Sequence, residues 1–280
     1  MKIQNKIKCR WRGVAFAMPS SLLVVLLFIY PFLLSFQRSF QLTDSSYSFA
    51  NYTESFHRYA PDIFYTVLIS IVSLVILLLI SAVLGGILRL YSFSVIEFLF
   101  KIPLFVPYVV VGHAVRVFLA PHGTLTSLLS ALSVLNPDHL APIAFSSAGL
   151  IFALVWKNLG LSLLLIVGAF RGVNENMLEA AEGMGANKLQ LIKDFLVPIC
   201  KNSFGVIAIL TFTSMIASFS IPAMIGNGGG NQMLMIDVYQ QMISQQNLGM
   251  ANAIGVYGYI FSMGATIYYL RGVGKSDNAK

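Results

Sequence analysis

Six long runs of apolar residues alternate with shorter polar segments along the chain. Each run has the length of at least ~18 residues that an α-helix needs to cross a bilayer. We expect the spans at about 14–36, 63–88, 98–119, 143–167, 203–225 and 249–270. The pattern indicates an all-α, polytopic membrane protein, with a transmembrane domain over 14–271 between short end segments, 1–13 and 272–280.

Basic residues are distributed unevenly between the two sides that six spans define. Of the 18 Lys and Arg residues, Arg38 and Arg58 fall in the outer segments, and Arg116 and Lys157 fall within spans. The remaining 14 of the 18 lie on the side that holds both ends of the chain. Because loops rich in Lys and Arg stay in the cytoplasm, both termini are expected there. The net charge of +7 is thus explained by topology, and nucleic-acid binding is excluded.

Composition supports the same class, because 57% of the residues are hydrophobic and only 10% are charged. These values exclude a soluble domain. Cys9 and Cys200 both fall on the cytoplasmic side, so no disulfide is expected. The polar and aromatic segment 37–62 is expected to form an outer loop.

The polar segment between the fourth and fifth spans, 172–200, has the features of two short helices separated by a break. Asn174 is suited to cap the first helix, and Glu175 falls in its first turn, where the helix dipole favours negative charge. Gly183 and Gly185 are expected to end this helix.

The second helix of this segment is expected to begin near Asn187 and to be stopped or kinked at Pro198. Its apolar side is predicted from residues spaced three or four apart, namely Leu189, Ile192, Phe195 and Leu196. Two short helices at a membrane surface are well shaped to fill a groove in another protein.

The segment resembles the EAA loop of bacterial ABC importer permeases. The pattern of that loop is Glu-Ala-Ala, three residues, Gly, nine residues, Ile, one residue and Leu-Pro. The residues that match it at the right spacing are Glu179, Ala180, Ala181, Gly185 and Pro198. Phe195 and Val197 stand where Ile and Leu are usual and remain apolar, whereas Met184 stands where Asp is common.

The resemblance implies a non-catalytic membrane subunit in the bacterial cytoplasmic (inner) membrane. Such a subunit pairs with a second, identical or homologous permease and binds two copies of a separate ATPase. It receives its solute from an extracytoplasmic solute-binding protein. The loop would be the coupling helix that docks into the ATPase, with Glu179 bonding a basic or backbone group there. Ala180 and Ala181 would allow close approach, and Gly185 would supply the break between the helices.

The outer end of the fifth span is similar to the spermidine/putrescine-type branch of these permeases. The similarity lies in the order Phe219, Pro222, Gly226 and a glycine-rich turn at 227–231. That branch imports polyamines, ferric iron, sulfate, thiamine and phosphonates. Pro222 is also expected to open the helix and expose carbonyl groups to a cavity.

Two basic side chains lie at membrane depth, where an ionisable group is expected to face protein or a watery cavity. The residues predicted to line the translocation path are Arg116, Lys157, Ser218, Phe219 and Pro222. For Lys157 an alternative is a structural contact with the partner permease or a backbone carbonyl, and Arg116 has the alternative of reaching the membrane surface. Because no acid within a span faces these charges, an anionic, phosphonate-like solute is favoured over a polyamine.

Nothing in the chain predicts a cofactor, a metal site or bound ATP. The stretch 271–276 looks like a phosphate loop, but Tyr269 stands where its first Gly is required. The four His residues are widely spaced and have no accompanying Cys pair. A secondary transporter or channel not driven by ATP is the alternative function. Ion-coupled carriers usually place acids within the membrane, whereas Asp and Glu fall here in loops and at span edges.

Overall fold

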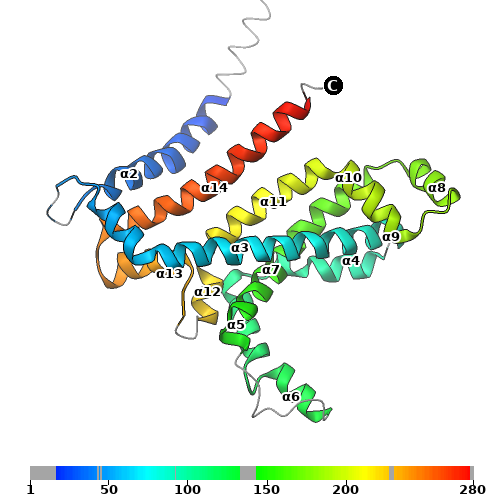
Figure 1. The fold of residues 1–280 in the computed structure, drawn as a ribbon, viewed down its shortest axis with the longest axis horizontal. Coiled ribbons are helices and arrows are strands. Elements are labelled where there is room, and N and C mark those ends of the chain that lie inside the picture. The colour runs from blue at the N-terminus through cyan, green and yellow to red at the C-terminus, as the bar shows by residue number, and fades with distance from the viewer. Residues whose placement is uncertain are drawn as a thin grey trace, which may run out of the picture. The chain divides into compact units, whose positions relative to one another are not determined.

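The computed structural model of the protein describes residues 17–42, 44, 46–91, 93–132, 143–226 and 230–277, the last six by their backbone alone. The described chain is helical apart from short turns and one isolated β-bridge, between Gln41 and Tyr47. The predicted all-α class is therefore confirmed for these residues (Figure 1). The chain divides into two units, 1–58 with 238–256 and 59–237 with 257–280.

The first unit is built around the helix Ala17–Ser39, which contains a π-helical turn at Val25–Ile29 and continues as α2 (Tyr30–Ser39). The unit also holds the first turns of α3 (Ala50–Tyr91), the π-helical turn Gln240–Ser244 and the start of α14 (Leu248–Asp277). Asn51 is buried and donates hydrogen bonds to the carbonyl oxygens of Ser39 and Gln41, at 3.0 and 2.9 Å. These bonds fix the start of α3 against the end of α2.

The predicted outer loop at 37–62 is wrong over its second half, because α3 already begins at Ala50. The Ser48 hydroxyl accepts the backbone N–H of Ala50, and the hydroxyls of Ser55 and Thr66 donate to carbonyls of their own helix. Hydropathy locates the part of a helix that crosses the membrane and not the end of the helix. At 42 residues α3 is about 60 Å long, roughly twice the hydrocarbon thickness.

The second unit contains the elements that position the candidate site (Figure 1). In chain order they are α4 (Ser94–Lys101), the 3₁₀ turn η2 (Ile102–Leu104), α5 (Tyr108–Leu119), α6 (Thr124–Ala131), η4 (Ile143–Phe145), α7 (Ser147–Arg171), α8 (Glu175–Gly183), α9 (Lys188–Gln190), the π-helical turn η5 (Leu191–Leu196), α10 (Val197–Ile199), α11 (Lys201–Ile216), α12 (Ser220–Ile225) and α13 (Leu234–Tyr239), whose last two residues belong to the first unit.

The helix α7 forms the centre of this unit. Its fully buried side chains Leu154 and Leu163 lie in one apolar cluster with Leu77 of α3, Val111 of α5 and Ile221 of α12. A second cluster packs the end of α7 against the loop that follows it. Because lipid tails are as apolar as these side chains, close packing between the helices, and not transfer out of water, stabilises such a cluster within a membrane.

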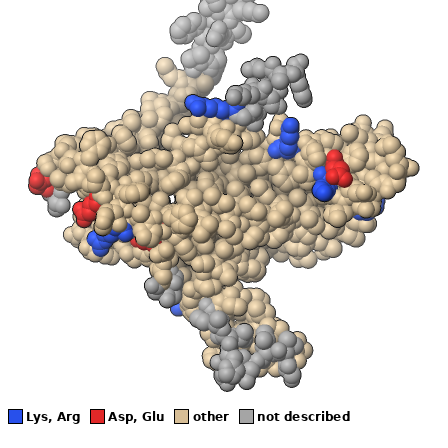
Figure 2. All heavy atoms as spheres, in the orientation of Figure 1, with Lys and Arg blue, Asp and Glu red and all other residues tan. Residues whose placement is uncertain are grey.

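Four helices of the described chain are long and apolar enough to cross a membrane, and the number rises to six if each of two bent helix pairs is one span. The upper number agrees with the six runs of the sequence. Figure 2 shows one face of the molecule, on which few Lys, Arg, Asp or Glu atoms interrupt a broad uncharged surface. Such a surface is expected where lipid replaces water as the solvent.

The third predicted span, 98–119, is broken into two helical segments. The segments Ser94–Leu104 and Tyr108–Ala131 meet at 104°. Pro103 lies in η2 and Pro107 is the last residue of the break, each without a backbone N–H, and Val106 before Pro107 is at a position that avoids helical backbone angles. Two prolines four residues apart therefore end one helix and begin another.

The fifth predicted span, 203–225, is broken three residues before the position that the sequence suggested. The break lies at residues 217–219, between α11 and α12, while Pro222 is the third residue of α12. A proline ring clashes with the carbonyl four residues earlier, which is that of Ser218. The proline is thus accommodated in a first helical turn, and the chain opens upstream of it.

Candidate functional site

The first helix of the segment 172–200, α8, begins as predicted. The Asn174 side chain accepts the backbone N–H of Asn176 at 3.0 Å and caps the helix. Arg89 of α3 donates to the carbonyls of Phe170 and Val173, at 3.2 and 3.4 Å. These bonds satisfy carbonyl groups at the end of α7 and connect it to the start of the loop.

The break between the two loop helices depends on Gly185, whose φ is +93°. A side chain at this left-handed position is disfavoured whatever space surrounds it. Beyond it Asn187 and Gln190 form a reciprocal capping box, which begins α9 where the sequence predicted a helix start. An ion pair between Lys188 and Glu182 spans the break. The turn is therefore well defined.

One side of the loop is buried in the second unit. Leu178 of α8, with Ile192 and Leu196 of η5, packs in the cluster that includes Phe170 of α7, and Ala181 of α8 is buried as well. These contacts fix the loop to the helices before and after it. Because the loop is fixed, a force applied to it reaches α7 and α11.

The predicted apolar side of the second loop helix is partly wrong. Leu189 is 64% exposed, whereas Leu191 is fully buried with Ile192 and Leu196. Residues 191–196 form a π-helical turn, in which each residue advances less than 100° around the axis. The regular 3.6-residue period used for the prediction does not hold there, so the buried face is rotated.

The opposite side of the loop is exposed and mixes apolar and acidic groups. Met184 is 80% exposed and Leu189 64%, and Glu179 and Ala180 are exposed beside them in sequence. Figure 1 shows α8 beyond the ends of its neighbours α7, α10 and α11 in the second unit. We call Met177, Glu179, Ala180, Met184 and Leu189 the docking face. An exposed short helix with apolar anchors is suited to fill a groove of a partner.

A buried carboxylate near the end of α7 was not singled out from the sequence. Glu97 of α4 accepts from Lys101 at 2.6 Å and from Arg171 through both of its oxygens, at 3.2 and 2.6 Å. It is 8% exposed, so its charge is balanced by two cations. The Glu97–Lys101 spacing of four was a detectable helical signal, but the pairing with Arg171 depends on the tertiary fold. The network attaches α4 to the end of α7.

Lys157, predicted to line the path, lies inside the second unit and is 8% exposed. Its ammonium group donates to the carbonyls of Pro103, Leu104 and Val106, at 2.9, 3.4 and 2.7 Å. The ring of Tyr108 lies 4.6 Å from the same nitrogen. This is the backbone-carbonyl contact that the sequence left open as an alternative.

The other predicted path residues lie near the C-terminal half of α5 and the break before α12. Arg116 donates to the carbonyl of Met224 at 3.2 Å and lies over the ring of Phe145. Pro222 is buried, and Ser218 is 5% exposed with no hydrogen-bond partner for its hydroxyl among the described residues. Phe219 is half-buried at the break itself. The structure therefore places these four residues on two packed half-helices, α5 and α12, and the turn before α12.

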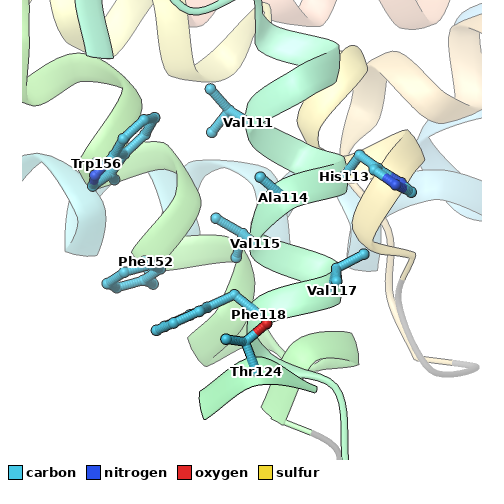
Figure 3. A pocket seen from close by; sticks show the side chains of 9 residues that line it. All are labelled: Val111, His113, Ala114, Val115, Val117, Phe118, Thr124, Phe152 and Trp156. Carbon is cyan, nitrogen blue, oxygen red and sulfur yellow. The ribbon is translucent and has the colours of Figure 1, made fainter. Parts of the chain in front are cut away.

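An apolar groove of about 580 Å³ lies between α5, α6 and α7 and was not predicted. Phe152 and Trp156 extend from α7 on one side, and Val115 and Phe118 from α5 face the same space (Figure 3). Phe152 and Trp156 are four residues apart, a spacing that places both on one helix face. Figure 3 shows His113 on the far side of α5 from Trp156.

The described residues contain no group of three or more His, Cys, Asp or Glu that could hold a metal ion.

Comparison with known proteins gives one family and several relatives. The family described as "Binding-protein-dependent transport system inner membrane component" matches residues 75–271. The probable ABC transporter permease YurN of Bacillus subtilis is 24% identical over 89% of this chain and 92% of its own length. The sulfoquinovosyl glycerol transport permease SmoG of Agrobacterium fabrum is 27% identical, over 46% of this chain. The match spans only 43% of SmoG.

Two further similarities concern a metal-transport permease and solved structures. The molybdenum transport permease ModB of Azotobacter vinelandii is 30% identical over 45% of this chain and 53% of its own length. A bacterial ABC transporter involved in alginate import has a chain with the same fold, with a TM-score of 0.77, 16% identity and coverage of 98% of this chain and 99% of that one. A second structure of an alginate transporter, in complex with an alginate-bound periplasmic protein, gives a TM-score of 0.76 at 18% identity. It covers 96% of both chains.

Proposed function

The chain belongs to the family of binding-protein-dependent transport system inner membrane components, and on that basis we propose that it is the membrane-spanning subunit of an ATP-driven importer. The observation that carries the proposal is the loop between α7 and α11, anchored on one side and exposed on the other. In this proposal the docking face binds a separate ATPase.

The mechanism we propose is mechanical. ATP binding draws two ATPase copies together, and each copy moves the loop docked into it. The loop is packed against Phe170 of α7 and Ile207 of α11, so its displacement tilts both helices. The chain and a second permease would thereby alternate between outward-open and inward-open states around a shared path.

Each residue of the EAA pattern has a proposed role that its position supports. Glu179 and Ala180 are exposed and available to the ATPase, while Ala181 is buried against the unit and anchors the helix. Gly185 forms the left-handed turn. Pro198 lies in α10, two residues before the segments Lys188–Ile199 and Lys201–Ile216 meet at 77°, and it terminates the loop.

For the solute we propose a small hydrophilic molecule handed over by an extracytoplasmic binding protein. The names of relatives support a sugar-like or oxyanion solute, since they mention sulfoquinovosyl glycerol, molybdenum and alginate. None of these names supports a polyamine or a phosphonate. The preference for an anion derived from Arg116 and Lys157 is weakened, because the three N–H bonds of Lys157 already have carbonyl acceptors.

The proposal is tested by purifying the tagged chain from its native membrane in mild detergent and identifying what accompanies it. We expect an ATPase, a second permease chain unless the pair is identical, and ATP hydrolysis by the preparation. A stable chain without an ATPase would favour the alternative of a secondary transporter or channel.

A further inference from the structure

We propose that Lys157 is a positioning residue that transmits motion from the coupling loop to α5 and α12, and that it is not a ligand for the solute. The inference rests on the importer function proposed above. It concerns the turn η2 and the residues that join it to α5, where the third span is broken.

The ammonium group of Lys157 uses all of its hydrogen-bonding capacity inside the protein. A lysine has three N–H donors and no acceptor, and three backbone carbonyls lie at hydrogen-bond distance. The acceptors belong to Pro103, Leu104 and Val106, whose carbonyls have lost helical partners at the break. The positive charge also faces the carbonyl end of α4 and η2, where the helix dipole favours a cation. No donor remains for a solute in this arrangement.

Gly160, about one turn of α7 after Lys157, also contacts η2 closely. A Cβ atom on Gly160 would lie 2.8 Å from the backbone nitrogen of Leu104 and 3.1 Å from the carbonyl oxygen of Lys101. Backbone atoms cannot move aside as a flexible side chain can, so only glycine permits this approach. Lys157 and Gly160 thus form a cradle on one face of α7 for η2.

The segment before the break is attached to α7 at a second point. Glu97 of α4 binds Arg171, the last residue of α7, through both carboxylate oxygens. Two attachments separated by several turns of α7 make α4 and η2 follow any tilt of that helix. The segment α4–η2 and α7 are therefore expected to move as one body.

Beyond the break, α5 is joined to α12 and α11. Gly112 lies so close to α12 that an added Cβ would meet Met224 Cβ at 2.8 Å. Arg116 donates to the carbonyl of Met224 at 3.2 Å, and the hydroxyl of Tyr108 lies 2.9 Å from that of Ser214 in α11. The half-helices α5 and α12 are thus packed as a pair, and the pair contains the proposed path residues.

Lys157 lies where these two bodies meet. Val106 and Tyr108 flank Pro107 at the start of α5, and both contact the Lys157 ammonium group. The other end of α7 leads within four residues to Glu175, the first residue of α8. A displacement of the docking face therefore reaches α5 through α7, Lys157 and the carbonyls of the break.

Replacing Lys157 with methionine keeps an unbranched side chain but leaves three buried carbonyls without donors. Unpaired buried polar groups are unfavourable, and the turn is expected to leave the cradle when force is applied to α7. The matched control is Lys201→Met, at an exposed position at the start of α11. Both variants are made in a chain that lacks Cys9 and Cys200.

The test measures the distance between spin labels on two exposed residues, His113 of α5 and Asn176 of α8, in the complex with its ATPase in nanodiscs. Distances are recorded without nucleotide and with ATP and vanadate. The chain with native Lys157 and the Lys201→Met variant are each expected to give one narrow distance distribution, both without nucleotide and with ATP and vanadate. The Lys157→Met variant is expected to give the same narrow distance distribution without nucleotide. When nucleotide is trapped, its label-to-label distance is expected to shift by more than ~2 Å, the scale of helix displacements in such transitions.

Two results would overturn the inference. Distributions for Lys157→Met that equal those of the unmodified chain in both states would show that the residue transmits nothing. The same shift of the Lys157→Met distribution with and without nucleotide would show a purely local packing role. If Lys157→Met does not retain the ATPase, the same distances are measured in Gly160→Ala, which keeps the charge of Lys157 but displaces η2. The same two results would then overturn the inference. Absence of an ATPase from the unmodified chain contradicts the importer function and not this inference alone.

Discussion

Replacing Gly185 with valine is expected to lower the affinity of the chain for its ATPase about tenfold while leaving membrane insertion intact. The φ of Gly185 is +93°, and a β-branched residue is a strong outlier in that region. The cost of a left-handed backbone is ~1–2 kcal/mol, and 1.4 kcal/mol corresponds to about a factor of ten in affinity. The strain is relieved by reopening the turn, which separates α8 from α9 and disperses the docking face.

The control for this variant is Gly183→Val, two residues earlier. Gly183 has no positive φ, and an added Cβ would meet nothing within 4 Å. The helix propensity of valine is within a few tenths of a kcal/mol of that of most other residues. Valine also loses less backbone entropy on folding than glycine does. Co-purification of the ATPase with each variant, relative to the tagged chain, measures the effect. Equal retention by both variants would mean that the left-handed turn is not required for docking.

Leu189 and Leu191 are expected to respond in opposite ways to replacement by alanine. Leu191 is fully buried, so Leu191→Ala is expected to destabilise the chain by about 2–5 kcal/mol through lost burial and a cavity. Leu189 is 64% exposed, so Leu189→Ala is expected to leave stability within ~0.5 kcal/mol of the unmodified chain. As an apolar anchor on the docking face, it should instead weaken ATPase binding by roughly 1–2 kcal/mol.

This pair is measured by thermal unfolding of the solubilised chain and by titration with the ATPase. The two leucines have the same side chain and lie on the same short segment, so side-chain size and location along the chain do not explain a difference between the two variants. The apolar side predicted from a regular helical period includes Leu189 and not Leu191. The opposite stability ranking would therefore contradict the π-helical turn at Leu191–Leu196.

The sequence predicted well what depends on local chemistry and hydropathy. Asn174 and Asn187 cap helices as expected, because capping needs only a side-chain oxygen close to free N–H groups in sequence. The break at Gly185 follows from a backbone restriction that belongs to a single residue. The number and order of the candidate membrane spans follow from the lengths of the apolar segments.

Features set by tertiary packing could not be predicted. The start of α3 at Ala50 depends on Asn51 binding carbonyls of a different helix. The partners of Lys157 and Glu97 are separated from them by 51 to 74 residues, apart from Lys101, and no spacing rule connects such positions. The rotated face at Leu191 arises from a π-helical turn, which a 3.6-residue period does not describe.

The central claim is that the exposed side of the loop between α7 and α11 binds the ATPase, and photo-cross-linking tests it most directly. A photoreactive residue is placed at Met184, 80% exposed on the docking face, or at Leu210, 49% exposed on α11 within the predicted fifth span. Membranes are irradiated before solubilisation. We predict a covalent product between the tagged chain and an ATPase from position 184 and none from position 210. Cross-linking at 210 alone, or at neither position while an ATPase co-purifies, would contradict the account.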